Sequence, residues 1–246
     1  MRLAKRILGT IGIIVVAFIA LVDFIVPDAL SSYLKKTASA SVYAVPTDLQ
    51  DLSVSQAPGM KMRYFSNEFE VPWNDVEEAE RKPFASKNSG GDSAWVCLRS
   101  GLRLFIAVTP AGAASSDYVL AKRFYEFSPD TMHIWPPSPR TQYKRLMLYM
   151  GKSQILSQVP STPAESGIFN LRSQSYRGFQ LGNPQVRQDG LRLELYSDDG
   201  RFAITFLQAG YGEPTGVTQA EINRIVQSLH KAPAGELAKS QAVATK

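Results

Sequence analysis

The sequence is poor in the side chains that build metal and nucleophile sites. It contains one cysteine, Cys97, and two histidines, His133 and His230. A single cysteine excludes an intrachain disulfide and a cysteine metal cluster within one chain, and neither histidine belongs to a ligand motif. We therefore predict no metal site and no cofactor. Cys97, inside the apolar run 94–98, is expected to be a small buried hydrophobe, with an intermolecular disulfide as the alternative.

Motifs of known catalytic designs are also missing. The chain has no Gly-x-Ser-x-Gly nucleophile elbow, no Gly-x-x-x-x-Gly-Lys-Ser/Thr phosphate loop and no Gly-x-Gly-x-x-Gly turn. We predict no catalytic residue and favour a protein without turnover. The alternative is an enzyme of unfamiliar design, with its cleft near the acidic loop 68–80 or near the aromatic cluster around Trp135. A buried, convergent group of titratable side chains would favour this alternative.

The charge balance excludes one class of partner. The formal net charge is +5, and the lysines and arginines form no concentrated basic stripe, so nucleic-acid binding is not expected. Hydrophobic residues make up 44% of the chain and charged residues 20%, which indicates a folded globular chain rather than a disordered one.

One long apolar run stands near the N-terminus. Residues 7–26 read ILGTIGIIVVAFIALVDFIV, with Asp23 as the only charge. About 20 helical residues span the roughly 30 Å hydrocarbon core of a bilayer, so we predict one transmembrane helix over this run. Arg2, Lys5 and Arg6 precede it. The positive-inside rule then leaves residues 1–6 in the cytoplasm and places the C-terminal domain outside, in the periplasm or at the cell exterior.

A cleaved signal peptide is the alternative for the same run. Ala38-Ser39-Ala40 has the small-residue spacing that a signal peptidase recognises, and cleavage there would make the protein secreted. The apolar run is longer than the usual seven to about fifteen residues of a signal peptide, and Pro27 to Lys36 separate its end from that site. We therefore favour an uncleaved anchor that tethers the protein to the membrane.

The rest of the chain divides into three parts. Residues 27–59 are expected to be a stalk, and residues 232–246, rich in alanine and lysine, a disordered tail. Between them, residues 60–231 form the predicted extracytoplasmic domain. Apolar residues alternate with a period of two in its strands and follow helical spacing in its helices. The strands are expected near 62–64, 69–73, 94–99, 102–108, 168–171, 176–181, 191–195 and 202–206, and the helices near 117–126, 141–154 and 219–229.

Local signals fix several of these elements. Ser197-Asp198-Asp199-Gly200 contains an Asp-Gly pair and predicts a tight hairpin. Thr218-Gln219-Ala220-Glu221 has the spacing of a helix capping box. The charged and then glycine-rich segment 77–92 is expected to be a loop. The order of strands, helices, further strands and a final helix indicates an α+β fold, with a largely antiparallel sheet, a middle helical section and a C-terminal helix packed on the sheet.

The C-terminal half resembles a known domain type. The segment GFQLGNP, the strand hairpin that follows it and the closing TQAEINRIVQSL helix resemble the corresponding part of PsbP-like domains. The resemblance lies in strand order and helix placement, covers roughly half of the chain and includes no diagnostic motif. It implies a non-enzymatic domain that binds a partner, and it transfers no functional residue.

Aromatic residues form one candidate binding surface. The cluster lies around Pro136-Pro137 and would line a groove for a peptide, a glycan or a lipid in an exported domain. Its members are Tyr125, Phe127, Trp135 and Tyr143. Core packing is the alternative role for these side chains.

Basic residues form a second candidate surface. Arg140, Lys144 and Arg145, together with Lys122, Arg123 and Lys152, would meet anionic lipid headgroups or an acidic partner if their helices share one outer face. A solvated helix surface is the alternative. The leading hypothesis is a membrane-tethered binding or accessory domain that acts on an envelope partner or a ligand. The sequence indicates no oligomeric state.

Overall fold

The computed structural model describes residues 2–26, 29, 32–33, 36, 42, 44–64, 66–83, 92–98, 101–110, 114–128, 139–157, 167–184, 190–208 and 215–232. The helical elements are α1 (Arg2–Ala20), the π-helical turn η1 (Leu21–Ile25), α3 (Ala114–Glu126), α4 (Pro139–Ser157) and α5 (Gln219–Ser228). The strands are β1 (Pro46–Asp48), β2 (Met60–Tyr64), β3 (Asn67–Val71), β4 (Val76–Pro83), β5 (Asp92–Leu98), β6 (Leu102–Pro110), β7 (Ile168–Arg172), β8 (Arg177–Leu181), β9 (Gly190–Ser197), β10 (Gly200–Gln208) and β11 (His230–Lys231).

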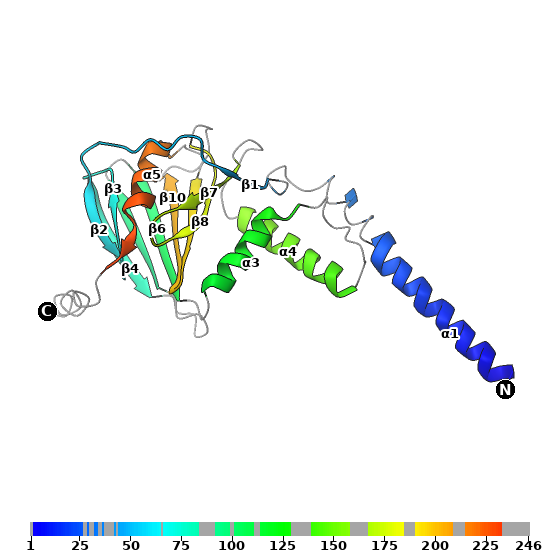
Figure 1. The fold of residues 1–246 in the computed structure, drawn as a ribbon. Helices are drawn as coiled ribbons and strands as arrows, with labels where there is room; N and C mark the ends of the chain where they lie inside the picture. Colours follow the sequence, from blue (N-terminus) through cyan, green and yellow to red (C-terminus); the bar gives the residue numbers. More distant parts are fainter. Residues whose placement is uncertain are drawn as a thin grey trace.

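The described strands form two sheets (Figure 1). The larger sheet has eight strands in the order β1-β7-β8-β9-β10-β6-β5-β4, and the smaller has three in the order β11-β3-β2. Neighbouring strands in the described ladders are antiparallel except β1 and β7, which run parallel. The expectation of one largely antiparallel sheet is therefore corrected to an α+β fold with two sheets, the larger of them mixed. Parallel pairing requires a long connection, which most of the domain provides between β1 and β7.

The charged strand β4 occupies part of the segment that was expected to be a loop. Its residues Val76–Pro83 pair with β5 at the end of the larger sheet. The sequence of β4, VEEAERKP, carries charges of both signs. Charged residues and a proline are common on edge strands, because they prevent pairing with another chain. The same composition reads as a loop when the pairing is unknown, so the loop prediction for 77–92 is wrong at its start.

The larger sheet buries one face against α5 and the smaller sheet. Alternate residues of β9 and β10, such as Leu193 and Ile204, point toward this side and are fully buried. They meet Phe69 of β3 and Ile222 and Ile225 of α5 in a single apolar core. Burial of this kind contributes about 1.5–3 kcal/mol for each large apolar side chain, so this core supplies much of the stability of the domain.

Helices α3 and α4 cover part of the opposite face of the same sheet. In Figure 1 these two helices lie on one side of the larger sheet, and α5, β2 and β3 lie on the other. The rings of Tyr125 from α3 and Phe179 from β8 pack with their centroids 4.4 Å apart, and Tyr118 stacks on Phe179 at 6.0 Å. A second core, separate from the first, therefore lies beneath the helices.

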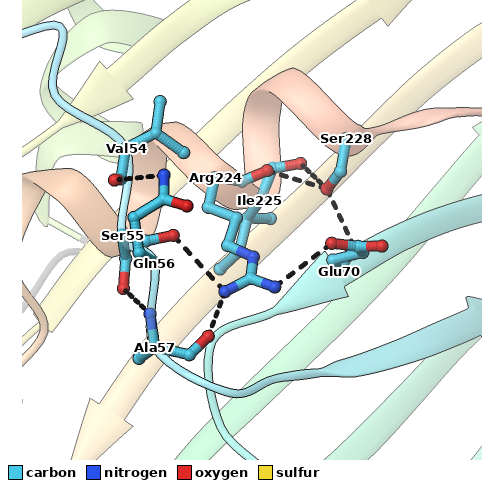
Figure 2. A network of polar contacts seen from close by, with 8 residues as sticks. All are labelled: Val54, Ser55, Gln56, Ala57, Glu70, Arg224, Ile225 and Ser228. Atoms are coloured by element: carbon cyan, nitrogen blue, oxygen red, sulfur yellow. Dashed lines mark hydrogen bonds and ion pairs between the residues drawn. The ribbon is translucent and has the colours of Figure 1, made fainter.

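Helix α5 binds the chain that precedes β2. Thr218 caps its N-terminus in a full capping box with Glu221, which confirms that prediction. Figure 2 shows Arg224 of α5 donating hydrogen bonds to the carbonyl oxygens of Ser55 and Ala57 and pairing with Glu70 of β3. Residues 51–57 of the expected stalk therefore lie along α5 and contact the folded domain.

The predicted transmembrane helix is wrong. Within the described part of the chain, no helix combines the length and the apolar character needed to cross a membrane. The regular helix α1 begins among the cations Arg2, Lys5 and Arg6 and ends at Ala20, where the π-helical turn η1 begins.

Candidate ligand-binding site

Strand β9 places charged side chains beneath a helix. Leu191, Leu193 and Leu195 face the first core, so Arg192 and Glu194 point to the opposite face, toward α3. The Glu194 side chain is fully buried there, because α3 packs across β8 and β9. A buried carboxylate is stable only with paired charges and hydrogen bonds.

Glu194 has partners for both of its carboxylate oxygens. Oε1 lies 2.5 Å from Nη2 of Arg201 and 2.9 Å from Nε of Arg192. Oε2 accepts hydrogen bonds from the hydroxyls of Tyr125, at 2.8 Å, and Tyr196, at 3.0 Å. Two guanidinium groups and two phenols therefore converge on one carboxylate, and we call these five residues the Glu194 cluster.

The cluster fixes the protonation state of each member. Burial alone would raise the pKa of the Glu194 carboxyl, but Arg201 and Arg192, with the Tyr125 hydroxyl, hold that pKa below its ordinary value. Burial, followed by the negative charge of Glu194, raises the pKa of Tyr125 and of Tyr196 above the ordinary value of a phenol. Glu194 is therefore ionised and both phenols are neutral near pH 7.

A cavity of about 330 Å³ opens beside this cluster. Apolar side chains of α3 and α4 form its walls, and four members of the cluster, Tyr125, Glu194, Tyr196 and Arg201, form its floor. Its volume lies at the lower end of the range for small-molecule sites, about 300–1,000 Å³. The lining residues are Thr109, Asp117, Leu120, Ala121, Phe124, Tyr125, Ile155, Glu194, Tyr196 and Arg201. The site is open to solvent and combines mainly apolar walls with hydrogen-bonding groups at one end.

The Glu194 cluster is the buried, convergent titratable group that would favour an enzyme, but its chemistry favours binding. A general acid or base is most effective when its pKa lies near the working pH, and the shifts of Glu194, Tyr125 and Tyr196 all lead away from neutrality. The two oxygens of Glu194 already hold four partners. The cluster therefore orients the cavity floor and holds α3 on the sheet.

A buried lysine fastens the end of α3 from the neighbouring helix. Lys152 of α4 is 0% exposed, and its Nζ donates to the carbonyl oxygens of Tyr125, at 3.0 Å, Phe127, at 2.7 Å, and Ala44. Three donors on one ammonium match three acceptors. Burial lowers the pKa of Lys152 to about 8, so the group is charged at pH 7. A cation is also favoured at the C-terminus of a helix, where α3 ends.

In the first predicted enzyme cleft, around residues 68–80, the carboxylates of Glu68 and Glu70 both lie in ion pairs. The side chains of Glu77, Glu78 and Glu80 lie outside the described part of the chain. A depression of about 400 Å³ lies there, between β2, β3 and the end of α5. Glu68 lies 3.4 Å from Arg63 and 3.3 Å from Nε2 of His230, and these contacts neutralise its charge in part. The hydroxyl of Ser228 donates a hydrogen bond to the carbonyl of Arg224 and accepts one from the backbone amide of Glu70, so it links the last turn of α5 to β3. These contacts are structural.

Only some of the predicted aromatic and basic residues have described side chains. Tyr125 is fully buried in the Glu194 cluster and lines the cavity, and Trp135 lies outside the described residues. Arg140 and Tyr143 belong to the first turns of α4, and their side chains also lie outside the described part.

The described basic side chains of α4 differ in their surroundings. Lys144 is exposed, whereas Arg145 is partly buried, and burial lowers its pKa. Lys152 is fully buried, so it does not share an outer face with Lys144. The expected common basic face therefore does not include every predicted lysine and arginine.

Sequence reasoning missed Glu194, Arg192, Arg201 and Tyr196. Their positions alternate with the leucines of β9 and the phenylalanines of β10, which is the pattern of a sheet with one solvated face. The helices that cover this face are not visible in that alternation. The available signal was the proximity of two arginines and one glutamate across a predicted tight hairpin.

Comparisons with known proteins identify no relative. No protein-family model, no curated protein and no solved structure matches the chain. The resemblance of the C-terminal half to PsbP-like domains therefore stays a prediction, and the function is inferred from the site alone.

Proposed function

We propose that the protein is a binding domain without catalytic turnover, and that the cavity beneath α3 receives a small, mainly apolar and uncharged ligand. The observation that carries this proposal is the combination of apolar walls from Leu120, Phe124 and Ile155 with the locked Glu194 cluster at the floor. The charges at the floor are already paired with each other. They therefore favour a ligand that brings a hydrogen-bonding group but no net charge, because an unpaired buried charge is costly.

A neutral fluorescent probe tests the cavity directly. N-phenyl-1-naphthylamine is uncharged at neutral pH and fluoresces strongly only in apolar surroundings. We expect saturable binding to the full chain. Ala121 lines the cavity, and Ala121→Trp should fill much of it and raise the dissociation constant of the probe about tenfold or more. The neighbouring Val119 is exposed and lies outside the lining, so Val119→Trp is the matched control.

The outcome separates the cavity from other apolar surfaces. Equal weakening by Ala121→Trp and Val119→Trp would place the probe elsewhere, and equal affinity of Ala121→Trp and the unmodified protein would do the same. Failure of the unmodified protein to bind the probe at all would reject the proposed ligand class. Circular dichroism of each variant shows whether the fold is kept.

We also propose, from the N-terminal sequence, that the protein is located outside the cytoplasm. Arg2, Lys5 and Arg6 followed by an apolar run have the layout of a signal segment, and Ala38-Ser39-Ala40 has the small-residue spacing of a cleavage site. N-terminal sequencing of the protein from fractionated host cells tests this proposal. A mature N-terminus after Ala40 in an extracytoplasmic fraction supports it, and an intact chain in the cytoplasmic fraction contradicts it. An envelope partner or anionic lipid at Lys144 and Arg145 stays a prediction.

A further inference from the structure

A row of arginines crosses the larger sheet at one end of the cavity. Arg172 of β7 lies directly opposite Arg177 of β8, Arg177 lies opposite Tyr196 of β9, and Tyr196 lies opposite Arg201 of β10. Residues opposite each other on neighbouring strands point to the same face, so these side chains lie on the α3 side of the sheet. Arg201 is held by Glu194, whereas Arg172 and Arg177 are exposed.

The pairing of Arg172 with Arg177 brings two like charges together. Like charges directly opposite each other on paired strands destabilise a sheet. The guanidinium carbon of Arg177 lies 4.2 Å from the ring centroid of Tyr118, which fixes that side chain on α3. Among the described residues, no carboxylate forms an ion pair with either arginine. Two arginines without an ion-pair partner in the described part of the chain therefore occupy directly opposite positions on β7 and β8.

Two surface depressions share this arginine pair. One, of about 390 Å³, lies at the turn between β7 and β8 and includes the exposed Ser175 and the acidic Asp198. The other, of about 530 Å³, lies between β7, α3 and α5 and includes Lys122, Asp48 and Glu126. Asp48 accepts a hydrogen bond from Asn170, and Glu126 pairs with Lys122. The first depression contains one carboxylate against the two arginines, and the second contains two carboxylates against three cations, so each depression has a net charge of +1.

We propose that Arg172 and Arg177 bind a phosphate group carried by a small ligand. A phosphate near pH 7 bears a charge close to −2 and has several acceptor oxygens, which match two guanidinium forks in charge and geometry. A carboxylate brings one charge and leaves one arginine uncompensated. The site is separate from the apolar cavity, so this proposal does not depend on the proposed function.

A phosphate titration tests the arginine pair. Inorganic phosphate is added to the full chain at constant ionic strength, and the NMR signals of the arginine Nε–H groups are followed. We expect saturable shifts, with Arg172→Ala raising the dissociation constant about tenfold or more, since hydrogen bonds to charged groups are strong. Arg177→Lys keeps the charge and the fold but loses the fork, and should weaken binding about threefold or more.

Two controls separate a site from general attraction. Arg103 is an exposed arginine on β6 that lines neither depression, so Arg103→Ala should leave the dissociation constant unchanged within about twofold. Acetate at equal ionic strength should bind about tenfold more weakly than phosphate. Shifts that do not saturate, equal losses in Arg103→Ala and Arg172→Ala, or equal affinity for acetate would each overturn the proposal.

Discussion

Replacement of Glu194 by glutamine probes the cluster that supports the cavity. The change keeps the size of the side chain and removes its charge, which leaves Arg192 and Arg201 without their carboxylate. Breaking a fully buried ion pair costs about 3–5 kcal/mol. Here the arginine side chains are 16% and 31% exposed, so solvent compensates part of their charge. We therefore expect Glu194→Gln to lower the free energy of unfolding by about 2–4 kcal/mol.

Urea unfolding followed by circular dichroism measures this loss, and a surface variant provides the comparison. Glu126 pairs with Lys122 on the exposed side of α3, at 52% and 51% exposure, so Glu126→Gln should cost less than about 0.5 kcal/mol. A loss of 3 kcal/mol would also lower the melting temperature by about 6–12 °C for a domain of this size. Equal losses in Glu194→Gln and Glu126→Gln would refute the reasoning.

Further predictions concern acid stability, the lysine clamp and strand packing. The pKa of Glu194 is lower in the folded state, so the stabilisation by its ionised carboxylate is complete above its ordinary pKa of 4.5 and is lost as pH falls through the folded value. In acid titrations, the difference in unfolding free energy between the unmodified protein and Glu194→Gln should therefore shrink below about pH 4.5. Lys152→Met leaves buried carbonyls without a donor and should cost about 2–4 kcal/mol in urea unfolding, whereas Lys144→Met on the exposed side of α4 should stay within about 0.5 kcal/mol. A Cβ at Gly178 would lie 1.8 Å from the carbonyl oxygen of Glu194, so Gly178→Ala should cost about 3 kcal/mol or more by the same measurement, unlike Gly12→Ala, where the space is open.

Local sequence signals predicted the hairpin turn and the helix start, because both are set by residues that are adjacent in the sequence. The segment Ser197-Asp198-Asp199-Gly200 predicted a tight hairpin between β9 and β10, and the structure confirms the hairpin, since Ser197 pairs with Gly200. The two turn residues are Asp198 and Asp199, and Gly200 is the first residue of β10 rather than part of the turn. Thr218 and Glu221 predicted the start of α5, and both hydrogen bonds of the capping box are present. Such signals act within a few residues of the chain and therefore need no knowledge of the fold.

Long-range pairing could not be derived in the same way. β1 has only three residues, and it joins the sheet through β7, more than a hundred residues later. The buried state of Glu194 depends on α3 lying across β9, which no alternation within the strand reveals. The apolar run 7–26 predicts one uniform helix, although the regular α-helix ends at Ala20 and a π-helical turn follows. Each error concerns a contact or a boundary set by distant parts of the chain.

The most direct measurement locates a bound probe within the cavity. Nuclear Overhauser contacts between N-phenyl-1-naphthylamine and selectively labelled leucine and isoleucine methyl groups of the full chain report which side chains touch it. If the cavity beneath α3 is the binding site, the contacts involve Leu120 and Ile155, which belong to its walls. Contacts confined to leucines elsewhere, such as the exposed Leu52, would contradict the assignment of this cavity.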